Sequence, residues 1–246
     1  MDSSTLLWMA LLMGLAAALY STVGHGGASA YLAIMALFAV APETMRPTAL
    51  ALNLVVAGFA GLRYWQAGQI NLRLLAAFLV TAAPAAFVGG GIAIGPEYYR
   101  PLVGIILWAA AVRLFWQPAR LAQREPRAPS LAVALPAGAG LGLLAGLTGT
   151  GGGIFLSPLI ILFGWEDARR TSGVAAGFIF VNSLAGLAGN FASVRSLPGG
   201  LPILLAAVTA GALAGTWLGA GRLPKPRLLQ GLGLVLVIAG AKLLFA

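Results

Sequence analysis

Two glycine-rich motifs, each inside an apolar segment, constrain the fold more than any other feature of the chain. Residues 21–27 read Ser-Thr-Val-Gly-His-Gly-Gly, and residues 147–153 read Leu-Thr-Gly-Thr-Gly-Gly-Gly. Consecutive glycines break a helix, permit positive φ and expose backbone N–H groups that no side chain covers. A polar break within an apolar segment, present once in each half, indicates a duplicated site inside a membrane-embedded fold.

The composition places these segments in a bilayer. Apolar residues make up 60% of the chain and charged residues 9%, and the mean hydropathy is +0.93. A soluble domain carries about 25% charged residues. The apolar runs lack the alternation of barrel strands, so helices must satisfy the backbone polar groups. We therefore predict an all-α polytopic membrane protein. The absence of cysteine excludes disulfides and thiolate metal ligands.

The apolar segments fall into two sets of five, separated by a linker rich in proline and charge. They cover residues 6–23, 28–41, 48–65, 72–94 and 101–116, and then 131–147, 154–164, 173–192, 200–220 and 228–245. We predict a first transmembrane repeat over 1–116, a cytoplasmic linker over 117–130 and a second repeat over 131–246, forming one domain.

Small residues recur at matching places in the two halves. Gly14, Ala18 and Thr22 match Gly138, Gly142 and Gly146, and Ala82, Ala86 and Gly90 match Gly211, Gly215 and Gly219. Small residues spaced four apart let helix backbones approach closely in lipid. These faces are expected to serve helix packing.

The second segment of each set is too short to cross a bilayer. Residues 154–164 would form a helix of about 16 Å, against a hydrocarbon core of about 30 Å. We predict that each half opens with a re-entrant hairpin whose tip is the glycine motif. Eleven of the 15 basic residues then share one side, whereas single crossings would divide them eight against seven. The positive-inside rule favours the hairpins, which place both termini in the periplasm and invert the second repeat.

The hairpin tips are suited to a small anion. Helices that begin just after the glycines point their N-terminal N–H groups and partial positive charge at the tip. The alternative role of the glycines is to permit close helix crossing. The predicted substrate-binding residues are Thr22, Gly24, His25, Gly26, Gly27, Ser29, Asn53, Thr148, Gly149, Thr150, Gly151, Gly152, Gly153 and Asn182.

Three polar side chains of this set have more than one interpretation. His25 is the only histidine, and it can contact the substrate, cap the hairpin tip in its neutral form, or take part in proton coupling. Thr150 occupies the matching position in the second half. Asn53 and Asn182 can hydrogen-bond either the substrate or a neighbouring helix.

Arginine follows the short segment in each half and leads into the next helix. Arg46, Thr48, Arg170, Thr171 and Ser172 are predicted to lie at the mouths or to gate them. The arginines would collect anions or anchor the helix ends at the interface, and Thr48 or Ser172 would cap a helix. The carboxylates, Glu166 among them, are expected in solvated loops, with no cluster suited to a cation. We expect no cofactor and no metal.

The chain resembles the TauE/SafE sulfite exporter family, also called the toluene sulfonate uptake permease family. The resemblance rests on the paired glycine motifs, the two-halved hydropathy and the Arg-Arg-Thr-Ser segment at 169–172 followed by the helix of Asn182. It is strongest from Gly149 through Pro158, and the first half departs from the family pattern at His25 and Ala28. The resemblance implies transport of sulfite, sulfoacetate or other organosulfonates across a bacterial inner membrane, with export as the common direction.

Two other functions are compatible with parts of the sequence. Gly-Ala-Ser-Ala at 27–30, with His25 nearby, gives a weak serine-hydrolase element. The small-residue faces alone would suit a structural membrane subunit. We favour a transporter, which is not an enzyme and whose partners are a small anion and membrane lipid, not nucleic acid. A homo-oligomer is left open. Export of an anion from a cell that is negative inside needs no coupled ion.

Overall fold

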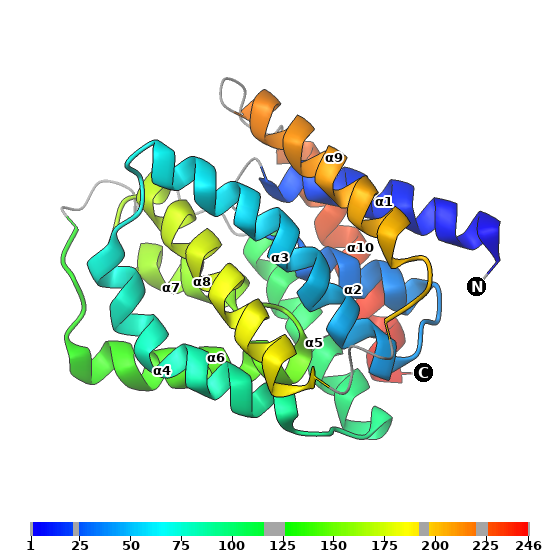
Figure 1. Cartoon of the computed structure of the whole chain (residues 1–246), viewed down its shortest axis with the longest axis horizontal. Coiled ribbons are helices and arrows are strands. Elements are labelled where there is room, and N and C mark those ends of the chain that lie inside the picture. The colour runs from blue at the N-terminus through cyan, green and yellow to red at the C-terminus, as the bar shows by residue number, and fades with distance from the viewer. Residues whose placement is uncertain (1, 22–24, 116–125, 192–196, 220–225, 246) are drawn as a thin grey trace.

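The computed structural model describes residues 2–21, 25–115, 126–191, 197–219 and 226–245, and these residues are predominantly helical (Figure 1). The all-α prediction is confirmed, and a described helix overlaps each predicted apolar segment. The helices are α1 (Ser3–Ser21), α2 (Ala28–Leu37), α3 (Pro42–Gln66), α4 (Leu72–Gly91), α5 (Pro96–Phe115), α6 (Leu131–Thr148), α7 (Gly153–Leu162), α8 (Ala168–Gly189), α9 (Leu201–Gly219) and α10 (Pro226–Phe245).

Helix lengths divide the described helices into spanning and short ones. By length and hydropathy, α1, α3, α4, α6 and α8 are able to cross a membrane, so the chain is a multi-pass membrane protein. Helices α2 and α7 have 10 residues each. At about 1.5 Å per residue they reach about half of the hydrocarbon thickness.

The predicted small-residue faces pack against each other in two parallel helix pairs. Gly211 and Gly215 of α9 lie against the backbone of Gly14 and Ala18 of α1. In the same way, α6 lies against α4, where Gly142 and Gly146 meet the carbonyls of Ala82 and Ala86. A Cβ at any of these glycines would overlap the neighbouring backbone. The packing role is therefore confirmed for these positions.

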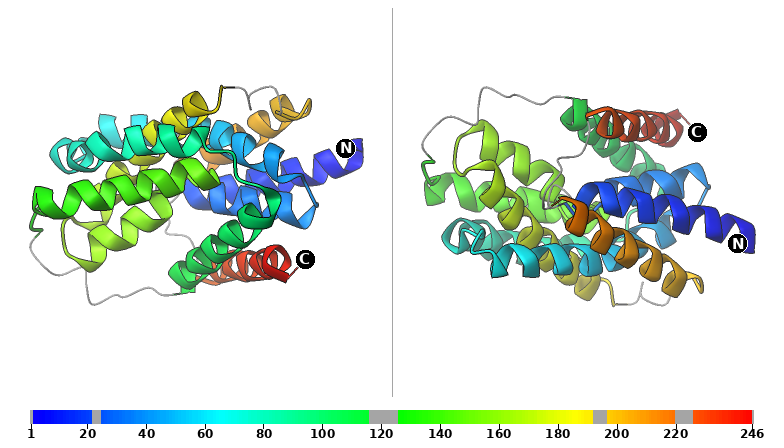
Figure 2. Two further views of the ribbon diagram at one scale, coloured as in Figure 1. Left: turned by 90° about the horizontal axis from the view of Figure 1, so that it is seen from below. Right: turned by 90° about the horizontal axis from the view of Figure 1, so that it is seen from above.

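The two predicted repeats pack on each other along most of their length. Helix α1 packs on α9, α4 on α6 and α8, α3 on α8, and α5 on α10. The ends of the described chain lie together at one end of the molecule, and α6 begins at the other (Figures 1 and 2). Helices α1 and α6 run in opposite directions in these views. The predicted boundaries of the repeats stay predictions, and most of the linker lies outside the described residues.

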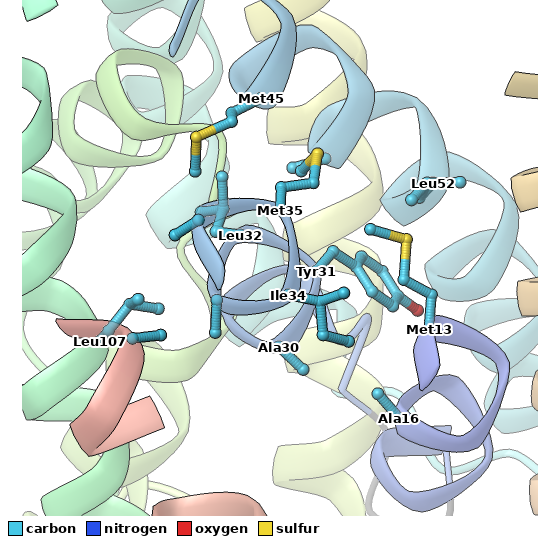
Figure 3. Close-up of a cluster of buried hydrophobic side chains, with 14 of the residues drawn as sticks. Met13, Ala16, Ala30, Tyr31, Leu32, Ile34, Met35, Met45, Leu52 and Leu107 are labelled. Atoms are coloured by element: carbon cyan, nitrogen blue, oxygen red, sulfur yellow. The ribbon is translucent and has the colours of Figure 1, made fainter. Parts of the chain in front are cut away.

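The short helix α2 lies inside the larger hydrophobic core. Nine of its 10 residues are buried. Tyr31 and Met35 of α2 belong to one buried cluster with Met13 of α1, Leu52 of α3 and Leu107 of α5 (Figure 3). Lys242 of α10 donates a hydrogen bond to Leu37 O at the end of α2, at 3.0 Å. The helix is therefore held by neighbours from both halves of the chain.

Helices α3 and α8 begin earlier than predicted, and their caps differ from the prediction. Ala41 is the N-cap of α3, with Pro42 in the first turn, where proline needs no N–H partner. Asp167 caps α8, because its Oδ1 accepts from the backbone N of Arg169 at 2.8 Å and of Arg170 at 3.0 Å. The prediction that Thr48 or Ser172 caps a helix was wrong.

The carboxylate of Glu166 lies between the two halves instead of in a solvated loop. Glu166 is 7% exposed. Its Oε2 accepts a hydrogen bond from Asn71 Nδ2 at 2.5 Å, and its Oε1 accepts one from the backbone N of Asp167 at 3.1 Å. The expectation of a solvated Glu166 was wrong, because these two amide donors replace water.

Candidate functional site

The first glycine motif forms the entry to α2, and we call its described residues 25–27 tip 1. The backbone N of His25 donates to Tyr20 O at 3.0 Å. Gly27 is the N-cap of α2, with φ of 90° in the left-handed region, which suits only glycine. Ala30 N in the first turn of α2 donates to Gly27 O at 3.0 Å, and the N–H groups before it have no acceptor within the helix and point toward the tip. Thr22 and Gly24 lie outside the described residues.

The second motif forms the break between α6 and α7, and we call residues 149–152 tip 2. Gly149, Gly151 and Gly152 have φ of 84°, 71° and 76°. Gly149 ends α6, and Gly152 is the N-cap of α7. Three left-handed residues within four positions turn the chain sharply enough for α7 to start beside the end of α6. Its first-turn N–H groups therefore also point toward a tip.

The two tips meet on one side chain of α3. A Cβ on Gly26 would lie 2.6 Å from Asn53 Oδ1, and a Cβ on Gly151 would lie 2.9 Å from Asn53 Nδ2. Ile179 of α8 also contacts both glycines, with its Cγ2 3.1 Å and 2.8 Å from the same two Cβ positions. Motifs about 125 residues apart in the sequence thus contact a single amide.

The polar side chains at this meeting point are buried without hydrogen-bond partners. Asn53 is 0% exposed, and neither of its amide atoms has a partner. Ser183 Oγ, 3.1 Å from the Cβ position of Gly151, is also unpartnered, as are both amide atoms of its buried neighbour Asn182. An unsatisfied buried polar group costs about 1–3 kcal/mol, and a bound polar ligand would remove that cost.

The predicted hydroxyl donors lie at the tips but already have protein partners. Thr148 Oγ1 donates to Leu144 O at 2.6 Å and lies 3.0 Å from Thr150 Oγ1. Ser29 Oγ lies 2.8 Å from the hydroxyl of Tyr20. The ring of His25 packs edge-on against that tyrosine, with ring centroids 6.5 Å apart. These groups shape the tips by bonding to the helices beside them.

Arg46, predicted to lie at a mouth, is buried behind tip 2. Its Nη1 donates to Ile92 O at 2.9 Å, and its Nη2 donates to Gly89 O at 2.8 Å and to Gly90 O. These carbonyls end α4, where a cation offsets the negative end of the helix dipole. The Cβ position of Gly149 lies 2.9 Å from Arg46 O. Arg46 therefore joins the end of α4 to the base of tip 2.

The other predicted mouth residues divide into buried and exposed ones. Thr48 and Thr171 are buried, with unpartnered hydroxyls. The Arg170 side chain is 54% exposed, with its Nε 3.9 Å from Asp167 Oδ2. Ser172 Oγ donates to Ala168 O at 3.1 Å on the exposed side of α8. Arg46 is therefore buried and Arg170 exposed, although the sequence places both near the start of a helix.

Sequence reasoning did not find Tyr31, Ile179 or Ser183 at the tips. The signal for Tyr31 is its spacing, because a residue four positions after an N-cap points back toward the helix start. Ser183 directly follows Asn182, which the sequence did indicate. Ile179 has no signal, since an apolar residue in an apolar helix does not stand out.

Two half-length helices begin at glycine tips, and the tips meet on the unpartnered amide of Asn53 among helices long enough to span a membrane. Half-length helices and irregular backbone deep in the membrane are typical of polytopic membrane transporters. The sulfite exporter TauE/SafE family matches residues 9–243 of the chain, and the chain belongs to that family.

A curated relative agrees with this assignment. The chain is 37% identical over 233 residues to the "Probable membrane transporter protein y4hK" of Sinorhizobium fredii, and the alignment covers 92% of this chain and 93% of the relative. No solved structure matches the chain significantly. The protein is a membrane transporter and not an enzyme, so the hydrolase and structural-subunit alternatives are not retained.

Proposed function

We propose that the protein exports small sulfur-containing oxyanions, such as sulfite, sulfoacetate or other organosulfonates, and that one anion binds between tip 1 and tip 2. The observation that carries this proposal is Asn53, which contacts both tips and is fully buried with no hydrogen bond at either amide atom. Its Nδ2 would donate to an anion oxygen that the N–H groups of both half-helices also reach.

The remaining predicted site residues surround this core of the proposal. The backbone N–H groups of tip 1 and tip 2 act as donors, except those of His25 and Gly149, which donate to Tyr20 O and Ala145 O. The glycines keep side chains out of their way. Asn182 supplies a second buried amide on α8. His25 donates to the anion or caps tip 1, with proton coupling as an additional role. Five further residues act outside the site. They hold helix ends together or gate the mouths and do not bind the anion: Arg46, Thr48, Arg170, Thr171 and Ser172.

We propose that the two halves form an inverted repeat in a bacterial inner membrane. Support comes from the opposite directions of α1 and α6 and from the exchanged packing of α1 on α9 and α6 on α4 (Figure 1). The ends of α3 and the starts of α4, α6 and α8 share one end of the molecule, and basic residues are concentrated there. That end faces the cytoplasm by the positive-inside rule, and both termini face the periplasm.

The membrane potential supplies the driving force for export. Moving one negative charge out of a cell that is negative inside is favourable by about 2.3 kcal/mol per 100 mV, and a dianion gains about twice that. Among the described residues no group of three or more histidine and acidic side chains is placed to hold a metal cation. We therefore propose facilitated efflux without an obligatory coupled ion.

Flux in proteoliposomes tests this function. Vesicles loaded with sulfite, sulfoacetate, taurine, thiosulfate or sulfate are given an inside-negative potential, with no proton or sodium gradient. We expect efflux of at least one sulfur oxyanion that rises with the potential and is absent from vesicles with no protein. Flux that needs a proton or sodium gradient even at a favourable potential contradicts the uncoupled mechanism, and no flux of any of these anions contradicts the substrate class.

Reporter fusions test the orientation separately. Fusions at Met1 and at Ala246 are both expected to give periplasmic signals. A cytoplasmic signal from either terminus contradicts the re-entrant hairpins and the inverted relation that depends on them.

A further inference from the structure

The hydroxyl of Tyr31 lies at tip 1, where the sequence gave no reason to look for a donor. Tyr31 is on α2, four residues after the N-cap Gly27, so its side chain points back toward the start of the helix. A Cβ on Gly27 would lie 2.7 Å from the Tyr31 hydroxyl oxygen. Gly26, the preceding residue, contacts Asn53. The phenol and the amide therefore flank two consecutive residues of the tip.

This hydroxyl is buried and has no hydrogen-bond partner. Tyr31 is 0% exposed, and its hydroxyl oxygen is one of the unpartnered polar atoms of the described residues. Its ring belongs to the buried cluster that also contains Met13 and Leu52 (Figure 3). The ring alone would fill this space, and a buried hydroxyl without a partner destabilises the fold. The hydroxyl is accounted for if a ligand oxygen accepts its proton.

The second half has no hydroxyl at the matching place. The position that corresponds to Tyr31, taken with the register that pairs Gly26 with Gly151, is Leu156. A Cβ on Gly152 would meet the ring of Phe178, with Cε1 at 2.9 Å. Tip 1 therefore carries a side-chain donor next to its N-cap, whereas the side chains nearest the N-cap of tip 2 are those of Phe178 and Ala145, which carry no donor.

We propose that the hydroxyl of Tyr31 donates a hydrogen bond to an oxygen of the sulfur–oxygen group of the transported anion, so that tip 1 contributes a side-chain donor that tip 2 lacks at the matching position. This rests on the proposed function. The bond adds to those from the backbone N–H groups and from Asn53. Ligands that share the sulfur–oxygen group lose the same amount of affinity when the hydroxyl is removed, whatever their remainder.

Tyr31→Phe separates this role from a structural one. We expect the purified variant to bind sulfite and sulfoacetate about 10- to 100-fold more weakly, the loss expected for one hydrogen bond to a charged group. Without anion, its melting temperature is expected to equal or exceed that of the wild type, because the variant removes an unsatisfied polar group. A structural role would lower the melting temperature and leave the affinity unchanged.

Two tyrosines of α5 serve as controls. Tyr98 is 71% exposed, so Tyr98→Phe is expected to change neither quantity. The hydroxyl of Tyr99 donates to Thr148 O at 3.0 Å, so Tyr99→Phe is expected to lower the melting temperature. Wild-type affinity in Tyr31→Phe, with binding intact in the wild type, overturns the inference alone. A wild type that binds neither probe overturns the proposed function together with it.

Discussion

The half-helices α2 and α7 have equal lengths and begin from matching glycine tips, but the rest of the chain encloses them differently. Helix α2 has nine of 10 residues buried, and α7 has five. Helix α2 packs against α1, α3, α5 and α10, whereas α7 packs mainly against α8. At tip 1 the nearby side chains include Tyr20, His25 and Tyr31, and at tip 2 the N-cap borders Phe178.

This difference indicates that the two halves of the duplicated sequence have different roles in the proposed site. The short helix of the first half is enclosed by α1, α3, α5 and α10 and carries polar side chains at its tip, so tip 1 is the more fixed and more polar side of the proposed site. In the second half, the shape of tip 2 depends on its backbone. Three of its glycines are left-handed, and Arg46 of the first half packs behind them. We expect tip 1 to determine which anion binds, and tip 2 to determine whether the site is formed.

The largest expected effect contrasts Arg46 with Arg170. Arg46→Met leaves the carbonyls of Gly89, Gly90 and Ile92 without their donor, and we expect a loss of about 3 kcal/mol of stability. Arg170→Met removes only an exposed contact to Asp167, worth less than about 1 kcal/mol. Denaturant unfolding in detergent measures both variants. Equal losses of stability in the two variants would contradict the proposal that Arg46 holds the end of α4 against tip 2.

A smaller effect contrasts the backbone at the two tips. Gly151→Ala places a Cβ on a left-handed residue next to Asn53, and we expect a stability loss of about 2 kcal/mol. Gly26 is not in the left-handed region, so Gly26→Ala mainly displaces the Asn53 amide, and we expect about 1 kcal/mol. Thermal unfolding of both variants measures this difference. The reverse order would contradict the assignment of backbone shape to tip 2.

The smallest effect concerns His25 and its counterpart Thr150. His25→Ala is expected to remain folded and to weaken anion binding by about 1 kcal/mol, or about fivefold, through one lost donor. Thr150→Ala is expected to weaken binding less, because the Thr150 hydroxyl is shared with Thr148. Calorimetric titration compares them. If His25→Ala binds the anion with wild-type affinity, His25 is not a ligand, and its role is to cap tip 1 in its neutral form.

The positions of the helices and of the two glycine tips could be predicted from the sequence, because both depend on local patterns. Apolar runs, glycine runs and small residues four apart are each read within one segment, and these features agree with the structure at α1, α6 and α9. Helix starts were less predictable. The predicted apolar segments begin at 48 and 101, whereas α3 begins at Pro42 and α5 at Pro96, because proline is compatible with a first helical turn.

The partners of the polar side chains could not be read from the sequence. Arg46 bonds carbonyls more than 40 residues away, and Glu166 bonds Asn71 across the two halves. The first depends on how α3 packs near the end of α4 within one repeat, and the second on how the two repeats pack, and no local pattern records either. Tyr31 was missed for a related reason, because a tyrosine in an apolar helix is usually a core residue. Only the missing partner of its hydroxyl distinguishes it.

Calorimetric titration of matched variants tests most directly the claim that both tips bind one anion. We expect the wild type to bind one anion per chain, and Asn53→Leu to lose at least about 10-fold in affinity, the effect of one lost charge-assisted hydrogen bond. Gly26→Val and Gly151→Val are each expected to lose about 100-fold, because the added side chain displaces the Asn53 amide and obstructs the tip. Asn53→Leu keeps the shape of the side chain and should fold in any case, because both of its amide atoms lack partners. Wild-type affinity in Asn53→Leu, or in a folded variant at either tip, would contradict the shared site.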